Sequence, residues 1–209
     1  MRIVTVFAGD PNSDRPASGW DSLPGFATEG EAVRQRREED AEACGIVGAE
    51  RCYLRFSEPV YAGFPDPAAV VADVNESVKD VDAVLLPGFP LIHRDHRWLA
   101  EHLVSGLRDS SLVGLYVEQP YRHQKTRYQR IRVDPSLNMH DVPRLAWHRL
   151  GMRRQEMQAK RRAISAYASQ LRWLELEGPS LDRMLVLEAL RGGERVAWLE
   201  ATRSSTHRG

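Results

Sequence analysis

With 209 residues, 42% of them hydrophobic and 28% charged, the chain has the size and composition of one globular domain. The 29 Lys and Arg balance the 29 Asp and Glu, and the two cysteines, Cys44 and Cys52, form no paired motif of a zinc finger, redox pair or disulfide scaffold. No apolar run is long enough to span a bilayer, and the apolar N-terminal stretch is too short for a secretory signal, so we expect a cytoplasmic protein with no membrane partner.

The first part of the chain alternates predicted strands with predicted helices. Residues 2–7 are rich in β-branched side chains and end at a turn, which predicts a buried strand. Thr28 and Glu31 have the spacing of a capping box, and the helix that they begin ends at Gly48. Then follow a strand (51–56), a helix (67–79), a strand (81–87), a helix (98–107) and a strand (112–117). This alternation predicts an α/β fold with a mainly parallel sheet.

Beyond Pro120 the pattern is weaker. The sequence predicts a short segment (145–150), a long helix (156–176), a shorter helix (180–190) and a final edge strand (195–199). We expect one α/β domain over residues 1–200, followed by a flexible tail at 201–209.

One segment is strongly basic. From Tyr121 to Arg162 the chain has 12 Lys and Arg against 3 Asp and Glu. Such a charge would attract nucleic acid. An amphipathic helix normally turns its arginines to solvent, however, so we prefer a solvated or internally paired surface and do not expect a nucleic-acid partner.

Ligand sites of parallel α/β sheets lie in the loops that follow the strands. The loop after the predicted strand at 81–87 places two imidazoles and a carboxylate within four residues, His93-Arg94-Asp95-His96. Histidine is the commonest zinc ligand, a carboxylate can orient its ring, and a second histidine can polarise a carbonyl or move a proton. The alternative is ordinary helix capping by Asp95, and the spacing alone favours this alternative.

Other candidates lie in the first two of these loops and on the first helix. Four polar residues of the loop after the first strand are placed to touch a polar substrate or to form turns: Asp10, Asn12, Asp14 and Asp21. Arg36 suits an ion pair with Glu39 within the helix, or it binds a substrate hydroxyl or phosphate. Glu58 follows the second strand at its carboxyl end, a position that favours function.

Four stretches taken together resemble the LmbE-like, PIG-L-type zinc N-deacetylases, which act on acetylated amino sugars. The stretches are residues 5–11; Arg36, Glu39, Ala43, Val47 and Gly48; His93-Arg94-Asp95-His96, with Arg94 in place of the family's Pro; and Lys160, Ala163, Tyr167, Ser169 and Gln170. They span most of residues 1–175, and their joint order is more specific than any one of them.

The resemblance implies a Rossmann-like three-layer sandwich and an N-deacetylase of an N-acylated amino sugar or glycosylated metabolite. By this resemblance His96 is a zinc ligand, His93 stabilises the tetrahedral intermediate, and Asp95 is the orienting partner. Arg36 and Glu58 face the small-molecule substrate, with Glu58 where the family usually has Asp. The oligomeric state stays open.

The chain departs from the family at one point. The motif Ala-His-Pro-Asp-Asp-Glu, which supplies two zinc ligands and the general base after the family's first strand, occurs nowhere in the 209 residues. A single histidine does not hold zinc at useful affinity, so we expect weak or absent zinc and an inactive chain.

Two explanations stay open. Either a first strand, loop and helix of about 30 to 40 residues are missing through a misplaced start codon, or the protein is a non-catalytic pseudoenzyme or sugar-binding protein that uses the same crevice. We favour the first explanation because the other motifs are undamaged.

Overall fold

The computed structural model describes residues 1–89, 91, 93–107, 112–119 and 146–199. They form two compact units, one from residues 1–77 and 151–193, and the other from the described residues of 78–150 and 194–199. Most of the basic segment and the expected tail at 201–209 lie outside the described residues. No described helix is both long enough and apolar enough to cross a membrane.

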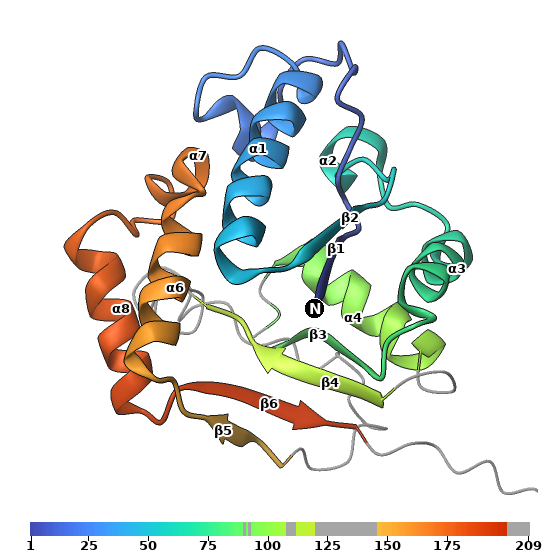
Figure 1. Ribbon diagram of the computed structural model, residues 1–209. Coiled ribbons are helices and arrows are strands. Elements are labelled where there is room, and N and C mark those ends of the chain that lie inside the picture. The colour runs from blue at the N-terminus through green and yellow to red at the C-terminus, as the bar shows by residue number, and fades with distance from the viewer. Residues whose placement is uncertain (90, 92, 108–111, 120–145, 200–209) are drawn as a thin grey trace, which may run out of the picture. The chain divides into compact units, whose positions relative to one another are not determined.

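The first unit is built on two parallel strands joined by a long helix (Figure 1). These elements are β1 (Arg2–Thr5), α1 (Glu29–Val47) and β2 (Glu50–Tyr53). The strands pair from Arg2 opposite Glu50 to Thr5 opposite Tyr53. Because the strands are parallel, their carboxyl ends lie at the same edge of the sheet.

The helix α1 begins and ends where the sequence predicts. The Thr28 side chain accepts a hydrogen bond from the Glu31 backbone N–H at 3.1 Å, and Gly48 ends the helix with a φ of 67°. Glycine suits this left-handed position because it has no Cβ to clash. The Glu31 carboxylate accepts from the Ala27 N–H at 2.7 Å, one residue earlier than in a standard capping box.

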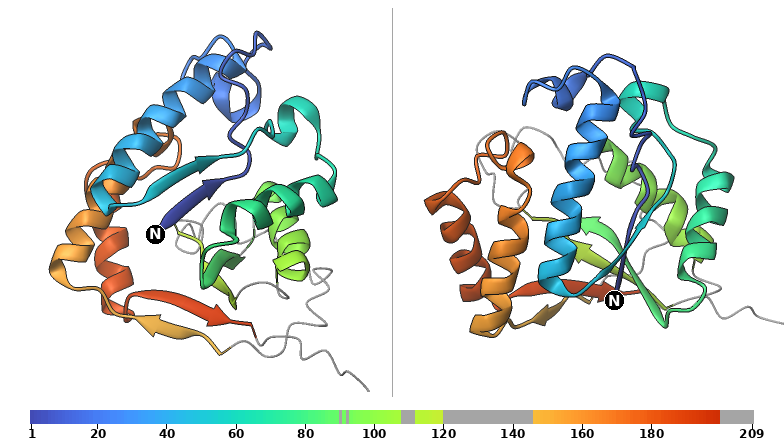
Figure 2. Two further views of the ribbon diagram at one scale, coloured as in Figure 1. Left: turned by 45° about the vertical axis from the view of Figure 1, so that its right-hand side comes forward. Right: turned by 45° about the horizontal axis from the view of Figure 1, so that its top comes forward.

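Further helices of the first unit are η1 (Gly19–Ser22), α2 (Pro59–Ala62), α3 (Pro67–Val78), α6 (Arg154–Ser165), α7 (Ala168–Leu171) and α8 (Pro179–Leu190). α6 and α7 pack against α1, and α8 packs against α6, as both views in Figure 2 show for α6 and α8. An apolar cluster joins α7 to α8 and consists of Leu171, Leu176, Leu181, Met184 and Leu185.

The structure divides the single helix that we expected over residues 156–176. α6 ends at Ser165, and α7 begins at Ala168 after a turn. The reason lies on α1, where the buried Glu39 carboxylate accepts hydrogen bonds from the Ser169 backbone N–H and hydroxyl, both at 2.8 Å. A carboxylate there satisfies donors at a helix start, so it stabilises a new N-terminus.

The second unit is a four-stranded sheet with the helix α4 on one face. Its strands, in the order β3-β4-β6-β5, are β3 (Ala83–Phe89), β4 (Leu112–Val117), β6 (Glu194–Trp198) and β5 (His148–Leu150). α4 (Arg94–Leu107) buries Ala100, Leu103 and Leu107. The buried sheet residues include Leu86, Val113, Leu115, Val196 and Ala197. Burial is continuous from Val113 to Leu115 on β4 and over Val196 and Ala197 on β6, as expected for strands in the interior of a sheet.

Two sequence expectations for the sheet need correction. The strand expected at an edge, β6, lies between β4 and β5 and is antiparallel to both. Gly114 on β4 permits this pairing, since a Cβ there would come within 2.8 Å of the Trp198 ring. The expected parallel pairing holds for β1–β2 and β3–β4. The three-layer arrangement and the loss of a first strand stay predictions.

Candidate functional site

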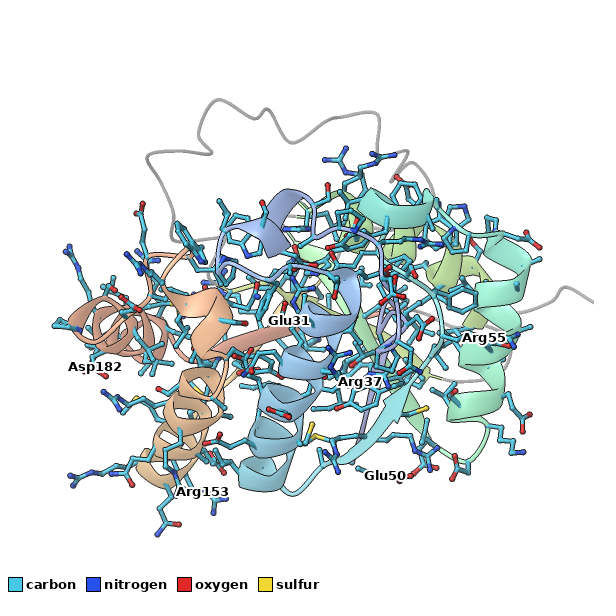
Figure 3. All side chains as sticks on the ribbon, turned by 90° about the horizontal axis from the view of Figure 1, so that it is seen from above. Glu31, Arg37, Glu50, Arg55, Arg153 and Asp182 are labelled. Atoms are coloured by element: carbon cyan, nitrogen blue, oxygen red, sulfur yellow. The ribbon has the colours of Figure 1, made fainter. Side chains whose placement is uncertain are left out.

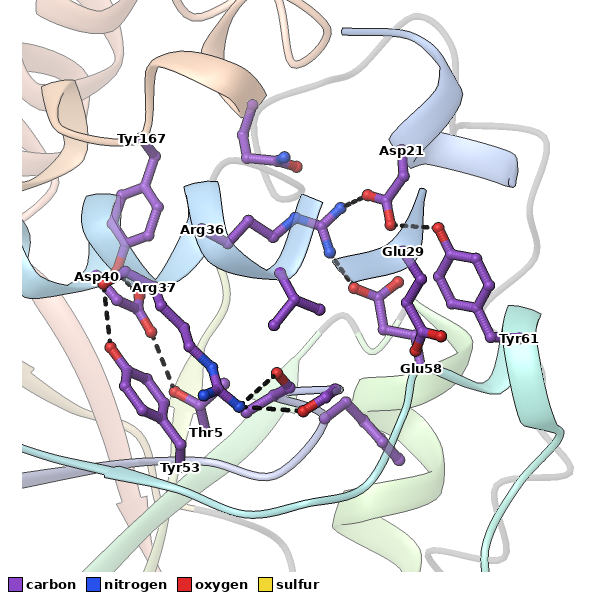
Figure 4. Close-up of a pocket in the computed structure, with 15 residues that line it drawn as sticks. Thr5, Asp21, Glu29, Arg36, Arg37, Asp40, Tyr53, Glu58, Tyr61 and Tyr167 are labelled. Carbon is purple, nitrogen blue, oxygen red and sulfur yellow. Dashed lines mark hydrogen bonds and ion pairs between the residues drawn. The ribbon is translucent and has the colours of Figure 1, made fainter. Parts of the chain in front are cut away.

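A pocket of about 270 Å³ opens in the first unit where β1 and β2 end. Its walls come from the residues after β1, one side of α1, the segment after β2 and the region of α7 (Figure 4). The ionisable Asp, Glu and Arg residues that line it are Asp21, Glu29, Arg36, Arg37, Asp40 and Glu58. The volume lies just below the range for small-molecule pockets, about 300–1,000 Å³, and suits a small ligand such as one sugar ring.

Arg36 lies between two carboxylates at one end of this pocket. Its guanidinium donates hydrogen bonds to Asp21 through Nη2 and to Glu58 through Nη1 (Figure 4). Asp21 is 2% exposed and also accepts a hydrogen bond from the Tyr61 hydroxyl at 2.6 Å. The structure therefore brings together Arg36 and Glu58, the two residues that the family resemblance places at the substrate.

The intrahelical alternative for Arg36 differs from what the structure shows. Glu39 bonds to Ser169 and receives the Gln35 amide at 3.3 Å, while Arg36 turns toward Asp21 and Glu58. Asp21 was missed as a partner because the loop around it has no periodicity. An aspartate in such a loop is indistinguishable from a turn residue until the loop folds back on α1.

Arg37 lies at the other end of the pocket, next to the backbone that follows β1. Its Nη2 donates to the Ala8 and Gly9 carbonyls at 3.3 and 3.0 Å. The guanidinium carbon is 5.0 Å from the centre of the Tyr53 ring, a cation–π distance. Arg37 belongs to α1 and is half-buried (Figure 3). Nη2 is therefore directed at the protein itself, whereas Nε is buried with no hydrogen-bond partner among the described residues.

Asp40 joins three chain segments beside Arg37. It accepts hydrogen bonds from the Tyr167 hydroxyl at 2.5 Å and the Thr5 hydroxyl at 3.3 Å. Burial and the bond to Asp40 raise the pKa of Tyr167 far above the ordinary range of a tyrosine. Burial, with a further contribution from Asp40, also raises the pKa of Tyr53. Both tyrosines are thus neutral hydroxyl groups at physiological pH.

Glu29 is the most buried carboxylate of the pocket, with a side chain 1% exposed. Its Oε2 accepts from the Ser13 hydroxyl at 2.6 Å, whereas Oε1 is buried with no hydrogen-bond partner among the described residues. Gly9 packs beside it with a φ of 62°, and a Cβ there would lie 2.6 Å from Val33 Cγ2. Glycine at this position therefore keeps the pocket wall close to α1.

Asp10, the third residue expected at the substrate, lies outside the set that lines the pocket. It is exposed, and its carboxylate accepts the Asn12 backbone N–H at 2.9 Å. This is the turn chemistry that the sequence offers as the alternative.

The residues His93, Asp95 and His96 lie in the second unit, at the start of α4. This helix begins at Arg94, four residues earlier than expected, so Asp95 and His96 form its first turn. His96 Nδ1 donates to Glu118, and the His93 and His96 rings are 5.2 Å apart between centres. Desolvation lowers the pKa of His93, and the neighbouring His96 lowers it further.

Glu118 is a site residue that the sequence analysis missed. It is 3% exposed, directly follows β4, and also accepts the Leu91 backbone N–H at 3.0 Å. Leu91 has a φ of 53°, an uncommon value for a residue with a side chain, and Arg97 donates to its carbonyl at 3.2 and 3.3 Å. The available signal was an acidic residue at the carboxyl end of a buried strand.

His96 with Glu118 behind it resembles the way proteins orient a metal-binding histidine, since a proton on Nδ1 leaves the lone pair on Nε2. Zinc needs more ligands than this. Among the described residues, no three His, Cys, Asp or Glu side chains are close enough together to hold a metal ion. The described part of the chain therefore does not fit a zinc ion by itself.

No protein-family model matches the chain, and no curated protein matches it. Solved structures do. A deacetylase of the teicoplanin biosynthesis pathway is 20% identical, with a TM-score of 0.74 over 97% of this chain and 87% of that one. The zinc-inhibited form of teicoplanin deacetylase Orf2 is also 20% identical, with a TM-score of 0.74 over 97% of this chain and 88% of that one. The A40926 pseudoaglycone deacetylase Dbv21 is 23% identical, with a TM-score of 0.70 over 94% of this chain and 83% of that one. At these identities the likeness shows a shared fold.

Proposed function

We propose that the protein is an N-deacetylase-type amidohydrolase whose substrate is an N-acylated amino sugar or a metabolite that carries one. The observation that carries this proposal is the fold that it shares with three glycopeptide deacetylase structures over at least 94% of the chain. The Arg36–Glu58 pair in a pocket of sugar-ring size and the Glu118-oriented His96 support it. The protein is proposed to act in the cytoplasm as a single α/β domain.

In this proposal, different residues of the chain bind the sugar and stabilise the reacting amide. Arg36 and Glu58 hold sugar hydroxyl groups, with Asp21 and Tyr61 fixing the guanidinium. His93 donates a hydrogen bond to the oxygen of the amide carbonyl as negative charge develops there, and Asp95 orients it. Asp10 contacts the substrate from the rim.

We further propose that these 209 residues do not hydrolyse amides without the two additional ligands and general base of the Ala-His-Pro-Asp-Asp-Glu motif. The lack of a described three-residue metal cluster supports this.

A non-catalytic sugar-binding protein is the second candidate. Two observations favour it: the pocket is formed within the first unit, and the described residues hold no complete metal site. A binding protein needs the Arg36 end of the pocket and does not need His93 or His96.

Zinc titration and amine release separate the two candidates. The purified chain, with and without zinc, is incubated with an N-acylglucosamine conjugate, and primary amine and acetate are measured. His96→Ala tests the proposed ligand, and Asp182→Asn is the matched surface control. We expect a weak zinc affinity that His96→Ala abolishes, and no amine. Stoichiometric zinc with amine release would show that the motif is dispensable. If amine is released only by a protein to which a segment with the Ala-His-Pro-Asp-Asp-Glu motif has been added, the result supports the enzyme. If that longer protein also releases no amine, the result supports the binding protein.

A further inference from the structure

A short loop borders the Arg36 end of the pocket in the first unit. This loop, residues 18–26, contains η1 and precedes α1, and we call it the η1 segment. Its ends lie close together, because the Ala17 N–H donates to the Ala27 carbonyl at 3.0 Å. A surface loop with closed ends can open as a local unit while the flanking elements keep their structure.

Three backbone hydrogen bonds of the η1 segment are local. The N–H groups of Asp21, Leu23 and Gly25 donate to the carbonyls of Ser18, Trp20 and Ser22, at 3.2, 3.3 and 3.3 Å respectively. Two glycines near its ends, Gly19 and Gly25, have φ values of 56° and 95°. Side chains rarely adopt such values, and small residues of this kind often serve as hinges. The hold of this segment on the rest of the unit therefore depends on side chains.

Trp20 links the η1 segment to α7. Its indole Nε1–H donates to Gln170 Oε1 at 2.8 Å. Gln170 lines the pocket, and its Nε2 donates to the Ser169 hydroxyl at 3.1 Å, which in turn bonds to Glu39. Since the indole can only donate, it needs the amide oxygen. The bond to Ser169 holds the glutamine with that oxygen toward Trp20.

Asp21, the next residue, holds the segment against α1. Its carboxylate is 2% exposed, pairs with Arg36 and accepts the Tyr61 hydroxyl, which also accepts the Ser18 N–H at 3.2 Å (Figure 4). A buried ion pair is costly to break. The Trp20 hydrogen bond is neutral and Trp20 is 37% exposed, so water can replace its acceptor at little cost. The segment should therefore open at Trp20 and stay held at Asp21.

We propose that the η1 segment is a lid on this pocket and that the hydrogen bond between Trp20 and Gln170 is its latch. Asp21 and Gln170 both line the pocket, so the latch joins two of its walls, while Trp20 itself lies outside the lining set. A ligand enters and leaves when the latch opens. The inference concerns the regulation of the proposed sugar site, and it rests on the proposed function for the sugar used below.

A cysteine placed inside the pocket measures how often the lid is open. Val33 is 8% exposed and lines the pocket, so the rate at which a soluble thiol reagent modifies Val33→Cys follows the open fraction. The full chain is used with Cys52→Ser, because Cys52 is half-buried whereas Cys44 is buried. An exposed cysteine, Asp182→Cys, is the matched control for the reagent.

Trp20→Phe keeps an aromatic ring and removes the donor of the latch, and Gln170→Leu removes its acceptor. Each should speed the modification of Val33→Cys about fivefold, in line with one neutral hydrogen bond, and leave that of Asp182→Cys unchanged. The double variant should be no faster than either single variant, because both remove the same contact. Either single variant carries the test if the other fails to fold.

Unchanged modification in a folded single variant, or a double variant whose gain is the product of the two single gains, would overturn the inference. Protection of Val33→Cys by N-acetyl-D-glucosamine tests the proposed sugar site in the same assay. Protection without an effect of the latch variants overturns the lid alone. A latch effect without protection overturns the proposed sugar site and supports the lid.

Discussion

Arg36 stabilises the fold in addition to its proposed role in substrate binding, because it forms an ion pair with the buried Asp21 carboxylate. Arg36→Met leaves that carboxylate with the Tyr61 hydroxyl as its one side-chain donor among the described residues. Removing one partner of a buried ion pair is costly, and since Arg36 is 24% exposed we expect a loss of about 2–3 kcal/mol in the free energy of unfolding. Urea denaturation measures it. The double variant with Asp21→Asn should recover part of this loss, and a cost of the double variant equal to the sum of the two single costs would contradict the account.

Glu118 should determine the tautomer of His96. Because Nδ1 donates to the Glu118 carboxylate, the neutral ring should carry its proton on Nδ1. Glu118→Gln weakens that preference, and it also weakens the hydrogen bond from the Leu91 N–H. We expect it to lower the free energy of unfolding by about 1–2 kcal/mol. Imidazole ¹⁵N shifts of wild type and variant report the tautomer. An Nε2-protonated ring in the wild type would show that Glu118 does not orient His96.

Tyr116 gives the fold a defined alkaline limit. Burial, with a further contribution from Glu118, raises its pKa to about 12 in the folded protein, against about 10 in the unfolded chain. The raised pKa means that its stabilising contribution is complete below about pH 10 and is lost as pH rises toward 12. Between about pH 9 and pH 11, the free energy of unfolding of Tyr116→Phe should fall by about 1 kcal/mol less than that of the wild type. Urea unfolding at the two pH values checks this, and equal losses would contradict it.

At the scale of elements, the break between α6 and α7 depends on a residue of α1. Glu39→Gln and Ser169→Ala each remove part of the contact that stabilises the start of α7. We expect each to lower the free energy of unfolding by about 1–2 kcal/mol, with a positive coupling in the double variant. Chemical denaturation of the four proteins of this cycle measures the coupling. Strict additivity would show that the contact does not hold α7.

Elements with local signals could be predicted from the sequence. Thr28, Glu31 and Gly48 mark both ends of α1, and the apolar run of β4 gives its bounds. The internal position of β6 could not be predicted, because it depends on which strands it pairs with and on Gly114 opposite Trp198. The start of α4 was placed too late because His93 to Arg97 contain no apolar residue.

At the scale of the whole molecule, the candidate site was predicted in part. Arg36 and Glu58 were expected at one place and do meet. Glu29 and Glu118 were missed as site residues, and the pairing of Asp21 with Arg36 was not predicted, because each acts through contacts with segments distant in the sequence. A single acidic residue in a loop or at a strand end has no pattern that distinguishes it from its neighbours.

The most direct test of the central claim is calorimetric titration of the 209-residue chain with an N-acylglucosamine conjugate in the presence of zinc, followed by assay of the released amine. We predict saturable binding, weakened about tenfold by Glu58→Gln through loss of a charge-assisted hydrogen bond, with no amine released. Absence of binding, or amine release by these residues alone, would contradict the account.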